Sequence, residues 1–248
     1  MYYYIFDQIR NSRARADFEK IKEIARNFSI PGEFAQISPA RSAEELVESA
    51  VDKAATTLIV IGSDTLINKV VSALIRCKSP SPIALGIIST DPESILYDRW
   101  GFKTYEDALE TIKFRKLERF TIGMIEPNFY FLSSARIECS KPTRMLVEID
   151  HYKVEGVFDR VEISNNLYVL IERFLKEKSL IKSTLNWLSG KETFDSDQSI
   201  FKGKIIRISS TEAIPVYIGS EVVTKTPINI YRKINALNII TKRDRIST

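Results

Sequence analysis

In the segment 1–118, short continuous runs of apolar residues alternate with segments whose apolar residues recur at helical spacing. The runs predict β-strands at 2–6, 33–37, 58–61 and 83–88. The stripes predict helices at 14–28, 42–51, 66–74 and 105–115. Strands that alternate with helices are typical of a doubly wound parallel sheet. The sequence therefore predicts an N-terminal α/β domain over residues 1–118.

The most informative stretch is the aliphatic run at 58–61, which stops at Gly62 and leads at once into the helix at 66–74. Such a run predicts a strand that is covered on both faces. The tight turn at 62–65 leaves backbone N–H groups at the start of the helix, which is how many α/β proteins bind phosphate. The alternative is an ordinary helix start, in which Asp64 or Ser63 caps the helix. Spacing alone favours the ordinary helix start over a phosphate site.

After residue 118 the pattern changes to short strands separated by turns. They are predicted at 119–125, 129–137, 145–149, 157–163, 167–174, 203–208, 216–218, 227–231 and 236–240. One helix is predicted at 179–188. This half therefore predicts an antiparallel, β-sandwich-like domain over residues 119–248 with one helix, and a ligand cleft between the two domains.

Composition and charge exclude several classes of protein. Of 248 residues, 44% are hydrophobic and 27% are charged, as in ordinary globular proteins. The net charge of +4 is spread along the chain, which argues against a nucleic-acid partner but permits contact with an anionic lipid or membrane surface. Two cysteines, Cys77 and Cys139, suggest no disulfide framework. The chain contains no run of ~18 consecutive apolar residues, which is the length that would span a bilayer. We expect a cytoplasmic protein that is either free in solution or bound at the membrane surface. The sequence does not indicate its oligomeric state.

Several motifs in the chain resemble those of one known family. They are Gly62-Ser-Asp-Thr-Leu-Ile-Asn-Lys-Val70 in place of G-G-D-G-T-l-N-E-V, the loop at 86–102, and the C-terminal segments at 201–208, 214–221 and 226–230. In order and spacing the chain resembles the diacylglycerol kinase catalytic domain family. That fold is shared by bacterial lipid kinases, ceramide and sphingosine kinases and, more distantly, NAD kinases. The resemblance covers nearly the whole chain, although no single motif is intact.

The resemblance implies a site at the turns that follow the strands ending near residues 62 and 88. By position it implies a catalytic role for Asp64 and no metal ligand. Residues implied in nucleotide binding are Gly62, Ser63, Asp64, Thr65, Asn68, Ser89 and Thr90. The implied cofactors are ATP and Mg²⁺, and the implied reaction is phosphoryl transfer to a lipid hydroxyl.

The departures from the family pattern bear on activity. Ser63 and Thr65 replace two glycines, and Asp91-Pro92 replaces the Gly-Thr of the second loop. If Thr65 must take a positive φ, the turn would store about 1–3 kcal/mol of strain, so a changed turn is expected. The acidic segment that the family carries after the position of Asn166 is absent.

Two functions remain open on the sequence. The first is a divergent lipid-kinase-like protein that has lost catalysis and binds a lipid or a nucleotide, with ATP and Mg²⁺ or with no cofactor. The alternative is an active ATP-dependent lipid kinase with an atypical site, in which Asp64 orients or deprotonates the acceptor hydroxyl. Arg10, Arg13 and Arg15 follow the first strand and either contact phosphates or form a solvated loop.

Overall fold

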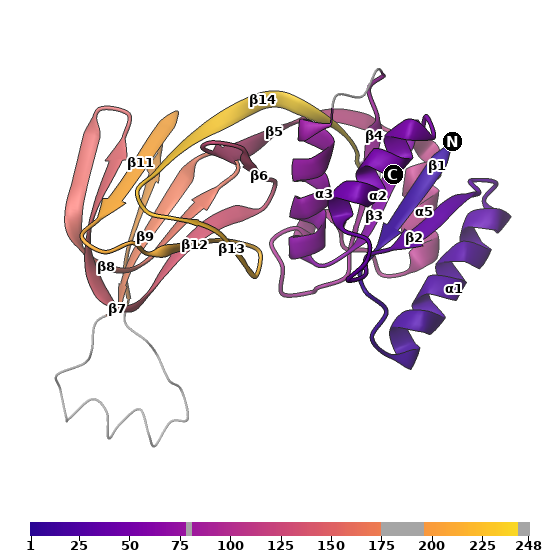
Figure 1. Ribbon diagram of the computed structural model, residues 1–248, viewed down its shortest axis with the longest axis horizontal. Coiled ribbons are helices and arrows are strands. Elements are labelled where there is room, and N and C mark those ends of the chain that lie inside the picture. The colour runs from indigo at the N-terminus through magenta and orange to yellow at the C-terminus, as the bar shows by residue number, and fades with distance from the viewer. Residues whose placement is uncertain (78–80, 175–195, 243–248) are drawn as a thin grey trace, which may run out of the picture. The chain divides into compact units, whose positions relative to one another are not determined.

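The computed structural model describes residues 1–77, 81–174 and 196–242 (Figure 1). Chain contacts divide these residues into two compact units. The first unit contains residues 1–122, 128–133 and 233 onwards, and the second contains 123–127 and 134–232. The division into domains at 118/119 stays a prediction.

The first unit is built on a parallel sheet. Its strands are β1 (Tyr2–Phe6), β2 (Gly32–Gln36), β3 (Thr57–Gly62) and β4 (Ala84–Ser89). β1 lies between β2 and β3, β3 pairs with β4, and every pairing is parallel. The last residues of β14 (Ile228–Ile240) pair with β4 in the same direction. The predicted parallel α/β region is confirmed.

The chain connections change direction at β1. From β1 the chain passes through α1 (Ser12–Asn27) to β2, on one side of β1. It then returns through α2 (Ala43–Asp52) to β3, on the other side, and continues through α3 (Asp64–Arg76) to β4. Open α/β sheets place ligand sites at such a switch point, outside the carboxyl ends of the strands. The residues that follow β1 and β3 are therefore the first candidates for a site.

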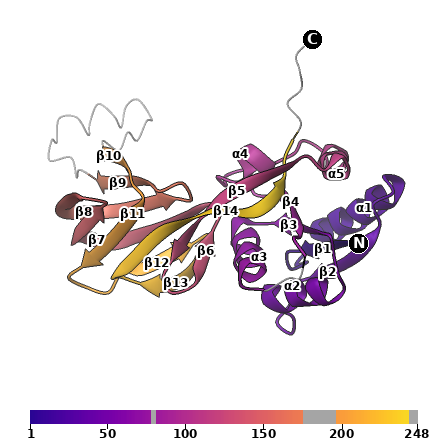
Figure 2. The ribbon, with the colours of Figure 1, turned by 90° about the horizontal axis from the view of Figure 1, so that it is seen from above.

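Helices cover both faces of the parallel sheet (Figure 2). α1 and α5 (Tyr105–Phe114) share one core, in which buried side chains such as Ile21, Ile59 and Leu109 pack together. α2 and α3 lie on the opposite face and pack against each other. Every residue of β3 and β4 is buried. Burial on both faces explains why these strands read as continuous aliphatic runs.

The second unit is largely antiparallel. Its long hairpin is formed by β7 (Ser134–Ile149) and β8 (Tyr152–Ser164). The sheet continues from β8 to β9 (Tyr168–Phe174) and β10 (Ser196–Lys202), and from β7 to β11 (Ile205–Ser210) and the first residues of β14. β12 (Pro215–Ile218) pairs with both β7 and β13 (Glu221–Lys225). The predicted antiparallel region is confirmed.

Some predicted boundaries were wrong. The strand predicted at 129–137 is divided into β6 (Phe129–Phe131) and β7, because the backbone N–H groups of Leu132 and Ser133 donate to a side chain on α3. The strands predicted at 227–231 and 236–240 are the single strand β14. Its exposed polar middle resembled a turn in the sequence.

Other elements were missed or could not be compared. β10, β13 and the short helix α4 (Tyr97–Trp100) were missed, and β5 (Leu117–Ile125) begins slightly earlier than predicted. The helix predicted at 179–188 lies outside the described residues. Among the helices that the structure describes, none is both long enough and apolar enough to cross a membrane.

The start of α2 gives a direct test of a feature predicted from sequence. Ser42 caps the helix by accepting a hydrogen bond from the N–H of Glu45, and the Glu45 carboxylate accepts one from the N–H of Ser42 at 2.7 Å. We expect Ser42→Ala to lower the free energy of unfolding by about 1 kcal/mol, because an N-terminal N–H loses its partner. Urea unfolding measures the change. Glu48→Ala, at an exposed position of the same helix, is the control and should change it by less than about 0.5 kcal/mol.

Candidate functional site

Asp7 and Ser63 meet at the switch point of the parallel sheet. Asp7 directly follows β1, and its N–H donates to the carbonyl of Ile61 at 3.1 Å. Ser63 directly follows β3, and its Oγ donates to Asp7 Oδ2 at 2.8 Å. The Ser63 N–H also approaches Asp7 Oδ2, at 3.4 Å. The Asp7 carboxylate therefore accepts hydrogen bonds from Ser63, the residue at the start of the turn into α3.

Gly62 allows this close approach. A Cβ added at Gly62 would lie 3.1 Å from Asp7 Cβ and 3.0 Å from Leu66 Cδ2. Both distances are shorter than ordinary van der Waals contacts, so a side chain would force the turn apart. The glycine is thus explained by the packing of Asp7 and Leu66 around the turn.

The helix start has the form predicted as the alternative to a phosphate site, with Ser63 rather than Asp64 as the cap. Ser63 is the N-cap of α3, with an extended backbone (φ −72°, ψ 163°), and its side chain accepts from the Leu66 N–H at 3.5 Å. Asp64 is the first helical residue, so the prediction that it could cap the helix is wrong. Thr65 lies inside the helix and is not among the described residues with positive φ. The strain considered for Thr65 does not arise, because the helix begins before it.

Asp64 is the most perturbed carboxyl group at this turn. Its Oδ1 is buried and has no hydrogen-bond partner among the described residues. Burial raises the pKa of Asp64, and the nearby charge of Asp91 raises it further, while a hydrogen bond with Ser94 opposes the shift. A half-buried carboxyl with a raised pKa is a candidate for accepting or donating a proton.

The end of β4 completes this group of residues. Ser89 is the neighbour of Gly62 in the sheet, and the Thr90 N–H donates to the Gly62 carbonyl at 3.1 Å. The hydroxyls of Ser89 and Ser94 lie 3.1 Å apart. The structure therefore brings Gly62, Ser63, Asp64, Thr65, Ser89 and Thr90 to the same edge of the sheet, as expected from parallel strand ends.

Asn68 lies one helical turn further along α3 and is buried. Its Nδ2 donates to the Asp64 carbonyl and to Ser133 Oγ, both at 2.8 Å. Its Oδ1 accepts from the N–H groups of Leu132 at 2.7 Å and Ser133 at 3.4 Å. Both ends of the amide are therefore engaged by the protein, and the side chain joins α3 to the segment after β6.

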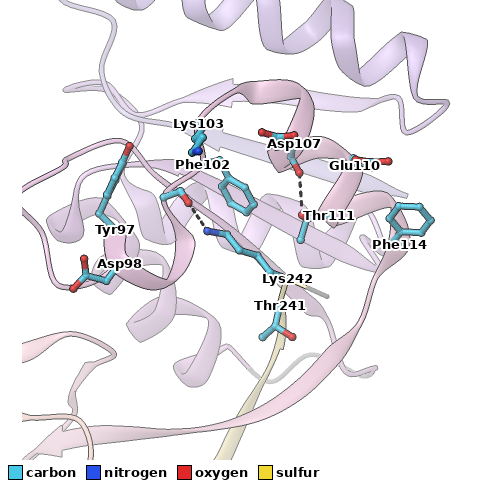
Figure 3. Close-up of a pocket in the computed structure, with 11 residues that line it drawn as sticks. Tyr97, Asp98, Phe102, Lys103, Asp107, Glu110, Thr111, Phe114, Thr241 and Lys242 are labelled. Atoms are coloured by element: carbon cyan, nitrogen blue, oxygen red, sulfur yellow. Dashed lines mark hydrogen bonds between the residues drawn. The ribbon is translucent and has the colours of Figure 1, made fainter. Parts of the chain in front are cut away.

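A pocket of about 720 Å³ in the first unit is lined by none of the predicted site residues (Figure 3). It lies among α4, α5 and the end of β14. Lys242 Nζ donates to the Gly101 carbonyl at 2.5 Å and lies 4.5 Å from the centre of the Phe102 ring. Burial lowers the pKa of Lys242, and Asp107 opposes this shift. Of the two lysines that line this pocket, Lys242 is therefore already engaged by the chain itself.

Within residues 1–77, 81–174 and 196–242, no three histidine, cysteine, aspartate or glutamate side chains are arranged to hold a metal ion. The turn itself thus offers hydroxyls, the half-buried carboxyl of Asp64, and two further carboxylates, Asp7 and Asp91.

Comparison with known proteins agrees with the fold. Residues 10–125 match the sequence profile described as "Diacylglycerol kinase catalytic domain". Over these residues, a little under half of the chain, the sequence is similar to the diacylglycerol kinase catalytic domain family. No curated protein matches the chain.

Solved structures agree with the fold over almost its full length. A diacylglycerol kinase from Bacillus anthracis str. Sterne aligns with a TM-score of 0.70 and 14% identity, over 97% of this chain and 96% of that chain. A "putative diacylglycerol kinase" from the same organism aligns with a TM-score of 0.72 and 13% identity, with the same coverage. At such identities the likeness establishes the shared fold.

Sequence reasoning missed two contributors to the site, Asp7 and Ser94. Neither residue was among the site residues that the sequence motifs implied. A topological signal for Asp7 was present, since it directly follows the strand beside β3. No sequence signal pointed to Ser94, whose contact with Ser89 depends on the path of the loop after β4.

The hydrogen bonds of the Asn68 amide lead us to expect that its removal lowers the stability of the fold strongly. We expect Asn68→Ala to lower the free energy of unfolding by about 2–4 kcal/mol, because buried donors on Leu132 and Ser133 lose their acceptor. Chemical denaturation measures the change. Ser72→Ala on the same helix is the control, with an expected change below about 0.5 kcal/mol. A small effect of Asn68→Ala would contradict this structural role.

The raised pKa of Asp64 predicts a pH-dependent effect on stability. The folded protein binds the proton of Asp64 more tightly than the unfolded chain, so ionised Asp64 destabilises the fold above its folded pKa. We expect Asp64→Asn to raise the melting temperature at pH 7, with the gain disappearing below the ordinary aspartate pKa. Glu23→Gln, at an exposed position of α1, controls for the loss of one negative charge. A gain that did not depend on pH would contradict this explanation.

Proposed function

We propose that this protein is a catalytically impaired member of the diacylglycerol kinase catalytic domain family that binds a lipid or a nucleotide without efficient phosphoryl transfer. One observation carries the proposal. The N–H and Oγ of Ser63, at the turn where the family resemblance implies phosphate binding, are directed to the carboxylate of Asp7.

The donor set at this turn fits a nucleotide's phosphates poorly. An anion site at a helix start needs N–H groups that are open to the ligand. Here Ser63 donates to Asp7 and the Leu66 N–H is directed to Ser63 Oγ. Asp91 adds negative charge near Asp64. Bound phosphates would have to displace one carboxylate and approach two others.

The sequence departures support the same proposal. Ser63 and Thr65 stand where the family resemblance implies glycines, and Ser63 uses its side chain to cap α3. Asp91 uses its Oδ1 to accept from the Glu93 N–H at 3.1 Å, which stabilises a loop of different chemistry from Gly-Thr. Asn68, one of the motif residues that are retained, is engaged in structural hydrogen bonds.

A second candidate function is an active ATP-dependent lipid kinase that phosphorylates a lipid hydroxyl with an atypical site. The observation that favours it is Asp64, whose buried Oδ1 has no partner among the described residues and whose pKa is raised. A carboxylate in this state can deprotonate an acceptor hydroxyl. In this case ATP with Mg²⁺ would supply the transferred phosphoryl group.

Under either function the proposed partner is a lipid or a membrane surface, and nucleic acid is not a proposed partner. The mild excess of positive charge, 36 basic against 32 acidic residues, is compatible with reversible contact with anionic lipids. The proposed location is the cytoplasm, with peripheral association at the membrane.

The test is transfer of radiolabelled phosphate from ATP and Mg²⁺ to diacylglycerol and mixed lipids. We expect transfer at the background rate, well below the ~1–100 s⁻¹ of ordinary kinases. Loss of one electrostatic stabiliser typically lowers a rate by about 10²–10³, and the changes at this turn need not multiply. Asp64→Ala should leave this background unchanged. Robust transfer that Asp64→Ala abolishes would establish the active kinase instead.

Thermal unfolding with ATP and Mg²⁺ separates nucleotide binding from catalysis. A nucleotide present at 100 times its Kd should stabilise the fold by about 2.7 kcal/mol. A shift without transfer identifies a nucleotide-binding homologue. The absence of a shift, together with binding to lipid vesicles, identifies a lipid-binding one. Neither form of binding would contradict the proposal.

A further inference from the structure

A second pocket in the first unit lies beside the carboxyl ends of β1 and β2. Its volume is about 400 Å³, and it is lined by residues of α1, β2 and the loops that follow β1 and β2. Two arginines contribute to it, Arg15 from α1 and Arg41 from the loop before α2. Arg41 is a residue that the motifs of the sequence did not single out.

Local hydrogen bonds fix the backbone position of both arginines. Arg15 belongs to the first turn of α1, and its N–H donates to the carbonyl of the N-cap residue Asn11 at 3.2 Å. Arg41 closes a tight turn with Ser38, because the N–H of each donates to the carbonyl of the other at 3.0 and 3.1 Å. The capped start of α2 follows at once. The two arginines are thus held on backbone that is hydrogen-bonded on both sides of the pocket.

The positive charges of the Arg15 and Arg41 guanidinium groups are not balanced by an acidic partner among the described residues. Neither guanidinium has a hydrogen bond or an ion pair there, and both side chains are exposed. The carboxylate that lines the pocket, Glu19, forms an ion pair with Lys22 at 3.2 Å. Arg10, by contrast, donates to Gln8 Oε1 at 3.3 Å. The pocket therefore carries positive charge in excess.

One wall of the pocket is aromatic. Phe18 and Phe34 both line it and pack edge to face, with ring centroids 6.4 Å apart and an interplanar angle of 82°. Phe34 is stacked on Tyr4, with centroids 4.3 Å apart, and Phe18 packs edge to face against Phe6. Because both rings are held by neighbours in the core, they form a preformed apolar surface next to the two guanidiniums.

We propose that this pocket binds a phosphomonoester, with the phosphate between Arg15 and Arg41 and the adjoining carbon group against Phe18 and Phe34. Guanidinium groups match the geometry of phosphate oxygens and are weakly hydrated, so they suit a dianion at an accessible site. The pocket volume accommodates a phosphate and a small organic group. The inference does not rest on the proposed function, since it uses none of the residues around Asp64.

The first measurement is binding of phenyl phosphate by isothermal titration calorimetry at low salt, with inorganic phosphate and phenol as the two halves of the ligand. We expect phenyl phosphate to bind more tightly than inorganic phosphate, and phenol not to bind measurably. Arg15→Gln and Arg41→Gln should each weaken phenyl phosphate binding about tenfold, because one charge-assisted contact is lost. Raising the salt concentration should weaken binding by the wild-type protein as well.

Matched variants separate this site from general charge. Arg26→Gln removes the same charge from the exposed last turn of α1 and should leave binding unchanged. Glu19→Gln should strengthen binding, and Phe18→Leu should reduce the preference for phenyl phosphate over inorganic phosphate. Circular dichroism and the melting temperature establish that each variant is folded. Asp64→Asn should bind as the wild type does, which keeps this test independent of the proposed function.

Vesicles identify the source of the phosphomonoester. Co-sedimentation with phosphatidylcholine vesicles that contain phosphatidic acid, against phosphatidylcholine alone, tests a lipid headgroup. Binding that requires both Arg15 and Arg41, in solution or on these vesicles, supports the proposal and assigns the ligand to that source. If no phosphate compound binds in either experiment, or if Arg26→Gln weakens binding as much as Arg15→Gln and Arg41→Gln do, the proposal is wrong.

Discussion

The contact between Asp7 and Ser63 determines the chemistry of the first unit. It joins the ends of β1 and β3 at the point where the chain connections change direction. In an open α/β sheet this point is where helix starts and strand ends converge on a ligand. Here a carboxylate of the chain itself accepts the hydrogen bonds that open the turn. Gly62 suits this position because a Cβ there would crowd Asp7 and Leu66, which would have to move by a few tenths of an ångström.

Several properties of the site follow from this contact. Ser63 becomes the cap of α3, so the helix begins at Asp64, and the N–H groups of Ser63 and Leu66 are directed to acceptors of the chain itself. Asp64 is then held at the helix start with one oxygen buried and with Asp91 nearby, and these two effects raise its pKa. A turn that in other proteins attracts phosphate thus carries negative charge. This is the physical basis for proposing impaired phosphoryl transfer.

The first unit also contains environments of opposite charge along one edge of the sheet. Carboxylates gather at the ends of β1, β3 and β4, whereas Arg15 and Arg41 lie beside the end of β2.

Asn68 is a motif residue whose role in this protein is to stabilise the fold. Its amide satisfies buried backbone donors of Leu132 and Ser133, which would be costly to leave unpaired.

The sequence by itself determined the elements whose signal is local. Continuous burial made β3 and β4 visible as aliphatic runs, and the capping box of Ser42 and Glu45 marked the start of α2. The motif order also pointed to the family whose profile matches residues 10–125, and to the edge of the sheet where six of the predicted site residues meet. These features depend on neighbours within a few residues, or on parallel strands ending at one edge, so that periodicity and topology suffice.

Only the tertiary structure decided what those residues contact. Whether Ser63 or Asp64 caps α3 depends on Asp7, which is 56 residues away in the chain. The division of the strand predicted at 129–137 depends on Asn68, and the pocket of Arg15 and Arg41 depends on a turn closed by Ser38. Hydrogen bonds and charges act over a few ångströms in space, whatever the separation along the chain. A motif therefore predicts where a site lies, whereas its chemistry is set by neighbours that the fold brings to it.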